Sequence, residues 1–170
     1  MFLFTISLVV GCKCHTDENT YIRAIYLTPQ DGGQLSIREI EDHQGILMVH
    51  SFSDLKEEFQ AKYAIWIDKD AIYMIEMEWL HDEPQMYSPL VLIGYNDALY
   101  SFREQLTGFE IEGVYVDCSK QSLEPGFSVW ILTEKTEKST SSFMKGYGEA
   151  PSVNQIIAVT DMLLEGNLPQ

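Results

Sequence analysis

Five polar residues follow apolar runs of this chain at points from which they could bind one ligand together. His50 comes near the end of ILMVHS, Asp68 ends YAIWID, Asn96 and Asp97 follow PLVLIGY, and Asp117 ends FEIEGVYVD. If these runs are parallel strands, their carboxyl ends meet at one edge of an open sheet, where ligands of α/β proteins bind. Carboxylate and amide oxygens suit a hard cation such as magnesium or calcium. We therefore expect a candidate ligand rim at His50, Asp68, Asn96, Asp97 and Asp117.

A structural role also accounts for these residues, one by one. Asp, Asn and Ser often follow strands because they cap the next helix, and a histidine at a strand end commonly bonds a neighbouring backbone group. The sequence contains neither a phosphate-binding loop nor a Gly-x-Ser-x-Gly motif. Cys12, Cys14 and His15 lack further ligands at a zinc spacing. We accordingly assign no catalytic residue, metal ligand or cofactor, and the balance leans away from an enzyme.

The charge of the chain restricts its partners. Its 170 residues contain 26 Asp and Glu against 11 Lys and Arg, a net charge of −15. Such a surface opposes binding to nucleic acid, whose phosphates require basic side chains, and to anionic lipid headgroups. It permits a basic protein partner or a divalent cation, and it also serves solubility alone. The length fits one domain.

Short apolar runs, most of them continuous rather than alternating, predict strands buried on both faces. The predicted strands are 21–28, 46–51, 63–68, 89–95, 109–117 and 127–133. Helical spacing with capping residues predicts helices between them. The predicted helices are 36–45, 53–59, 96–108 and 152–166, with Ser152 as the cap of the last and Gly166 as its end.

Two segments decide the class of the sheet. Residues 70–80 read as a helix capped by Asp70, or as the second strand of a hairpin at 63–80. The helix is favoured because no Asn-Gly or Asp-Gly turn is present. Residues 133–151 are rich in Ser, Thr and Gly and predict a long connection containing at most one helical turn. We expect one three-layer α/β domain with a mainly parallel sheet of about five strands; the alternative is a mixed α+β sheet with a hairpin at 63–80.

The first twelve residues, MFLFTISLVVGC, are apolar or small and carry no charge. Val9, Val10, Gly11 and Cys12 resemble the lipobox of a bacterial lipoprotein signal peptide, in which cleavage precedes the cysteine and the cysteine carries the lipid. The run is too short for a transmembrane helix, which needs about 20 residues. A signal peptide normally opens with Lys or Arg, and none precedes Lys13, so either the true start lies upstream of Met1 or the run is not a signal peptide. Because FLFTISLVV is rich in β-forming residues, the run also reads as a buried first strand.

The resemblance implies a division of the chain and a location. Residues 1–11 are then a signal peptide, 12–20 a polar tether and 21–170 the globular domain. It implies attachment to the cell membrane through lipid on Cys12, with the domain on the extracytoplasmic face. Together with the acidity, it predicts a binding module for an unidentified partner, for which a basic protein is suited. The alternative is a small extracytoplasmic metal-assisted hydrolase that uses the acidic rim.

Overall fold

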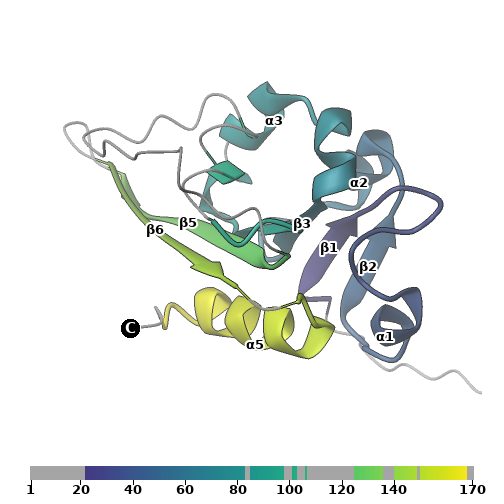
Figure 1. Cartoon of the computed structure of the whole chain (residues 1–170). Coiled ribbons are helices and arrows are strands. Elements are labelled where there is room, and N and C mark those ends of the chain that lie inside the picture. Colours follow the sequence, from purple (N-terminus) through teal and green to yellow (C-terminus); the bar gives the residue numbers. More distant parts are fainter. Residues whose placement is uncertain are drawn as a thin grey trace, which may run out of the picture.

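Six strands form one sheet in the order β2-β1-β3-β4-β5-β6 (Figure 1). The computed structural model describes residues 22–82, 85–97, 101–102, 106, 125–135, 140–148 and 150–167. The strands are β1 Ala24–Leu27, β2 Ile46–Val49, β3 Ala64–Asp68, β4 Leu90–Ile93, β5 Phe127–Lys135 and β6 Thr140–Tyr147. Strands β2, β1, β3 and β4 are parallel to one another, whereas β5 and β6 are added antiparallel. The sheet is therefore mixed, as in α/β or α+β proteins.

Helices lie on both faces of this sheet. They are α1 Ile37–Glu41, α2 Phe52–Glu58, η1 Lys69–Met74 (a 3₁₀ helix), α3 Met77–His81, η2 Gln85–Tyr87 (also 3₁₀) and α5 Val153–Leu164. In Figure 1, α1 and α5 lie below the sheet, and α2 and α3 lie above it. Ser51 and Ser152 cap α2 and α5 through their side chains, which accept from the backbone N–H groups of Asp54 and Gln155.

Alternating residues of the strands fill two hydrophobic cores, one on each face. In β1, Ile25 and Leu27 face the core that contains Leu55 of α2, while Ala24 and Tyr26 face the core that contains Ile156 of α5. The same alternation continues through β3 and β4. Strands that bury both faces must be apolar at every position, which explains their continuous apolar runs.

Much of the predicted element order is confirmed. Strands occur within five of the six predicted runs, and the sixth, 109–117, lies outside the described residues. The hairpin alternative at 63–80 is wrong, because residues 69–74 and 77–81 are helical. The connection predicted at 133–151 is also wrong, because β5 continues to Lys135 and β6 occupies Thr140–Tyr147. The apolar face of β6 is too sparse to predict a strand, and pairing with β5 supplies its hydrogen bonds.

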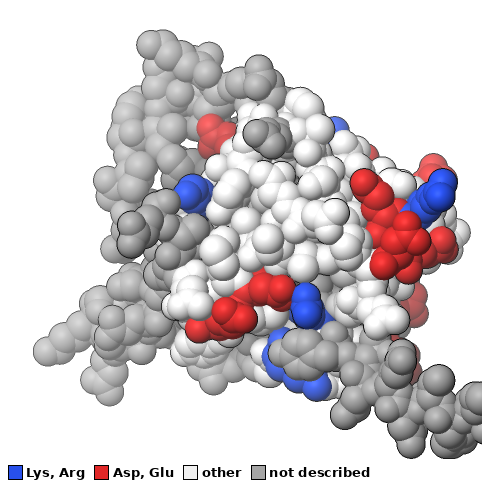
Figure 2. Space-filling model, turned by 90° about the horizontal axis from the view of Figure 1, so that it is seen from below, with Lys and Arg blue, Asp and Glu red and all other residues white. Residues whose placement is uncertain are grey.

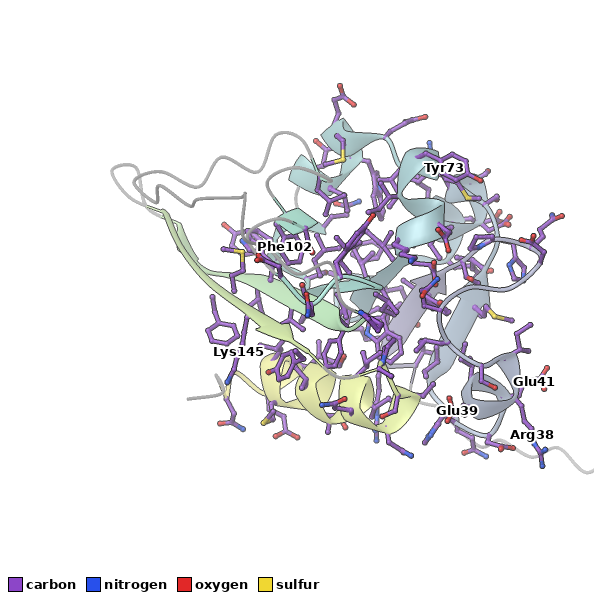
Figure 3. All side chains as sticks on the ribbon, viewed as in Figure 1. Arg38, Glu39, Glu41, Tyr73, Phe102 and Lys145 are labelled. Atoms are coloured by element: carbon purple, nitrogen blue, oxygen red, sulfur yellow. The ribbon has the colours of Figure 1, made fainter. Side chains whose placement is uncertain are left out.

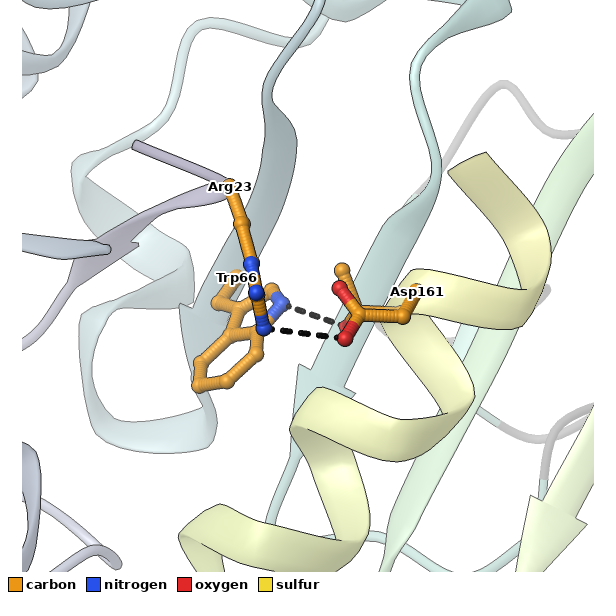
Figure 4. A network of polar contacts seen from close by, with 4 residues as sticks. Arg23, Trp66 and Asp161 are labelled. Carbon is orange, nitrogen blue, oxygen red and sulfur yellow. Dashed lines mark hydrogen bonds and ion pairs between the residues drawn. The ribbon is translucent and has the colours of Figure 1, made fainter. Parts of the chain in front are cut away.

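The last helix is fastened to the sheet by two polar contacts of different depth (Figure 4). The indole Nε1 of Trp66, in β3, donates to Thr160 Oγ1 at 3.0 Å, and both residues are buried. Arg23 Nη1 pairs with Asp161 Oδ2 at 3.0 Å, with side chains that are 43% and 35% exposed. The first bond satisfies a buried donor, whereas water competes with the second.

We predict that Thr160→Val lowers the free energy of unfolding by about 1–3 kcal/mol, because the buried indole N–H loses its acceptor. The neighbouring substitution Asp161→Asn, which weakens the exposed ion pair, costs at most about 1 kcal/mol. Urea unfolding of both variants measures the difference. An equal or larger loss in Asp161→Asn would show that α5 is held by the surface pair instead.

Candidate functional site

The expected rim lies at the carboxyl edge of the parallel strands. His50 follows β2, Asp68 ends β3, and Asn96 and Asp97 follow β4; Asp117 lies outside the described residues. Neighbouring strands are about 4.8 Å apart, and β1 separates β2 from β3, so His50 and Asp68 start about 10 Å apart in the sheet. The connection that follows β1 runs to one face of the sheet, and the connection that follows β3 runs to the other. In open α/β sheets, ligands bind between two such strands.

The carboxylate of Asp68 is fully buried and already accepts three hydrogen bonds. The hydroxyl of Tyr26 and the backbone N–H of Gln34 each donate to Oδ2 at 2.6 Å. The backbone N–H of Asp70 donates to Oδ1 at 3.0 Å, so that Asp68 caps η1. These donors replace the water that the carboxylate loses on burial. Asp68 therefore joins two strands and two connections, which is the structural role of a capping residue.

Burial and the adjacent carboxylate act on Tyr26 in the same direction. The loss of solvent raises the pKa of the Tyr26 hydroxyl first, and the hydrogen bond to Asp68 and its negative charge raise that pKa further. Tyr26 is thus held in its neutral, donating form. The Tyr26 ring packs in the core, edge to face with the ring of Trp66, and the two ring centroids are 6.3 Å apart. The Tyr26 hydroxyl reaches Asp68 at the carboxyl end of β3.

The connection between β1 and α1 closes over this carboxylate. A Cβ atom at Gly33 would overlap Asp68 Oδ2 and would lie 2.5 Å from Thr28 Oγ1. Only glycine permits such an approach of the backbone. Thr28 Oγ1 is buried and makes no hydrogen bond in the structure. The β1–α1 loop occupies the space beside Asp68, between the ends of β1 and β3. Leu35 of this loop packs into the core that contains Ile156 of α5.

The remaining rim residues belong to separate local contacts. His50 Nδ1 lies 3.1 Å from the carbonyl oxygen of Thr28, which links the ends of β2 and β1. Asn96 lies against Gly126 at the start of β5. The carbonyl oxygen of Asp97 accepts from both the backbone N–H and the hydroxyl of Ser101. The structure thus brings Asp68 together with Tyr26 and Gln34, whereas the contacts described for His50 and Asn96 are made with other residues, and Asp117 lies outside the described residues.

The partners of Asp68 were missed by the sequence reasoning. Tyr26 stands inside an apolar strand and reads as a core residue, and Gln34 contributes only its backbone N–H. A usable signal was the two-residue period of β1, which places Tyr26 and Thr28 on one face. Because every residue except proline carries a backbone N–H, the residue types in the sequence do not show which backbone group will donate to Asp68.

Among the described residues, no three His, Cys, Asp or Glu side chains come close enough to hold a metal ion together. Within the same part of the chain, no helix is both long and apolar enough to cross a bilayer. Comparison of the chain with family models, with curated proteins and with solved structures gave no match.

We predict that Tyr26→Phe destabilises the protein by about 1–3 kcal/mol at neutral pH, because buried Asp68 loses one of its donors. The same change at Tyr73, whose side chain is 78% exposed, is the control and shifts stability by at most about 0.5 kcal/mol. Chemical unfolding of the two variants and the wild type provides the comparison. Equal effects of the two changes would contradict the role of the Tyr26 hydroxyl.

The raised pKa of Tyr26 predicts a specific alkaline instability. The pKa of Tyr26 in the folded state lies above about 10, the ordinary value that it has in the unfolded chain. The neutral Tyr26 hydroxyl therefore makes its full contribution to the free energy of unfolding below about pH 10, and this contribution is lost as the pH rises above that value. Between about pH 9 and 11, the wild type therefore loses more unfolding free energy than Tyr26→Phe. Parallel curves of stability against pH would be inconsistent with this assignment.

Proposed function

We propose that this chain is a lipid-anchored interaction domain on the extracytoplasmic face of a cell membrane, and that it binds a basic protein partner. The observation that carries the proposal is the position of the acidic side chains. Most acidic side chains of the described residues are exposed on helices and connections. Asp68, at the point of the sheet best placed for a ligand, is instead buried and hydrogen-bonded. We also assign the domain to the three-layer α/β class, because helices flank both faces of the parallel strands.

All but one of the exposed acids among the described residues lie between residues 31 and 82. They are Asp31, Glu39, Glu41, Asp42, Asp54, Glu57, Glu58, Asp70, Glu76, Glu78, Asp82 and Glu165. Figure 2, seen from below, shows acidic side chains at the margins of that face and a wide uncharged area between them. In Figure 3, Glu39 and Glu41 lie on α1 beneath the sheet. The exposed carboxylates are thus spread over several elements, an arrangement that suits recognition of a basic protein surface.

The membrane anchor rests on the N-terminal sequence. Val9, Val10, Gly11 and Cys12 satisfy the lipobox pattern, and residues 13–20 supply a polar spacer before the first described residue, Ile22. Each methylene of an acyl chain inserted in the bilayer contributes about 0.8 kcal/mol, so several chains hold a domain firmly. The negative charge of the domain opposes adhesion to anionic headgroups, which leaves the lipid as the attachment.

The metal-assisted hydrolase is the weaker proposal. It needs rim carboxylates with oxygens directed at a shared cation. Both oxygens of Asp68 already accept hydrogen bonds from the protein. The arrangement of the described rim residues therefore favours the interaction domain.

We predict that the chain produced in a bacterial host is recovered with membranes as a form beginning at lipid-modified Cys12. Cys12→Ala should abolish the lipid and shift the protein from the membrane fraction, whereas the control Cys14→Ala should retain both. The intact mass of the N-terminal peptide and cell fractionation measure these outcomes. An unmodified chain beginning at Met1 and recovered without membranes would contradict the anchor.

The interaction domain itself is tested with a defined basic ligand. We predict that the domain binds a synthetic amphipathic peptide of Leu and Lys, about 18 residues or five helical turns long, with an affinity that falls as salt rises. The same peptide with Glu in place of Lys is the control and should not bind. Fluorescence anisotropy measures both peptides. Equal binding of the two, or none of either, would contradict recognition of a basic partner.

A further inference from the structure

The helical layer above the sheet carries the most exposed aromatic side chain among the described residues. Tyr73, in η1, is 78% exposed, and Figure 3 shows it at the outside of this layer, far from α1. Four half-buried apolar side chains in residues 69–81 pack against the core beneath and leave part of their surface exposed: Ile72, Met74, Met77 and Trp79. An exposed apolar patch rimmed by polar residues marks protein interaction sites, and methionine adapts such surfaces to their partners.

Carboxylates border this patch. Residues 69–82 contain four acidic residues and one lysine. Asp70 and Tyr73 are three positions apart in a 3₁₀ helix, in which side chains at i and i+3 eclipse, so they share one side of η1. Asp70 is held in place by the Gln34 side-chain amide, which donates to Oδ2 at 3.0 Å. A fixed carboxylate beside an exposed aromatic ring suits the cationic head of a lysine or arginine.

One of the protein's own lysines, Lys56 in the same helical layer, is held between an aromatic ring and a carboxylate. Lys56 Nζ, in α2, lies 4.4 Å from the centroid of the Phe52 ring and 3.6 Å from Glu76 Oε2. The ring of Trp79 meets Phe52 and Phe59 edge to face, with centroids 5.5 and 5.4 Å apart, which fixes α3 against α2. These ring contacts hold α3 in place against α2, and the Lys56–Glu76 ion pair lies beside them.

We propose that this surface, formed by Asp70, Tyr73, Glu76, Met77 and Glu78 and named here the η1–α3 surface, is the docking site for a basic amphipathic helix of the partner. The inference rests on the proposed function and specifies where its partner binds. Apolar side chains of the helix contact Tyr73 and Met77, while its lysines or arginines pair with Asp70 and Glu78; Glu76 already pairs with Lys56 of α2. Charge complementarity selects this occupant, because an apolar patch bordered by carboxylates repels an acidic helix or a second copy of a chain with a net charge of −15.

Two pairs of matched variants test the site, each with the basic Leu–Lys peptide and the full chain. Tyr73→Ser is paired with Ile37→Ser, which removes an apolar side chain that is 42% exposed on α1. Glu78→Lys is paired with Glu39→Lys, since each reverses an acid in the first turn of a five-residue helix. Because all four positions are exposed, the variants should fold, and thermal unfolding checks that they do.

We expect Tyr73→Ser and Glu78→Lys each to weaken peptide binding by at least about fivefold, and their α1 counterparts by less than about twofold. Equal losses of peptide affinity in both pairs would show that the peptide is attracted to the acidic protein as a whole and not to this site. Larger losses in the α1 variants would show that the peptide binds on the opposite face. Both results would overturn the inference while leaving a basic partner in place. Failure of the wild type to bind the peptide would instead overturn the proposed function.

Discussion

The buried carboxylate of Asp68 constrains the whole carboxyl edge of the sheet. A charge removed from water costs several kcal/mol unless donors replace its hydration. Asp68 meets this requirement with the Tyr26 hydroxyl and the backbone N–H groups of Gln34 and Asp70. The requirement explains why the β1–α1 connection folds inward at Gly33 and why η1 starts directly after β3. It also fixes the start of η1, the helix that carries Tyr73.

This constraint separates the acids of the protein into two kinds. Asp68 supports the fold, and its oxygens are committed to protein donors. The exposed acids of α2, η1 and α3 remain at the surface, where water solvates them and a cationic partner can reach them. Since opposite charges at an interface raise association rates and reject like-charged molecules, these acids bear on specificity more than on stability.

The order of elements was largely predictable, because strands buried on both faces leave continuous apolar runs such as YAIWID, and because Ser152 and Gly166 delimit α5. Strand β6 was not predictable, since Ser141, Ser142 and Gly146 conceal its period and its stability comes from pairing with β5. At the site, the position of Asp68 at a strand end was predicted. Its capping of the next helix was the structural alternative given above, and the structure confirms it for η1. Its bonds to Tyr26 and to the backbone of Gln34 were not predicted, because Tyr26 reads as a core residue and residue types do not reveal a backbone donor.

The most direct measurement is hydrogen exchange of the backbone amides with and without the basic Leu–Lys peptide. We predict slower exchange on binding within residues 69–81. We predict no change in the β1–α1 connection, residues 28–36, because that loop is already hydrogen-bonded to Asp68. Protection confined to residues 28–36 and to His50 would show that the carboxyl edge of the sheet is the binding site, and would contradict a purely structural role for Asp68.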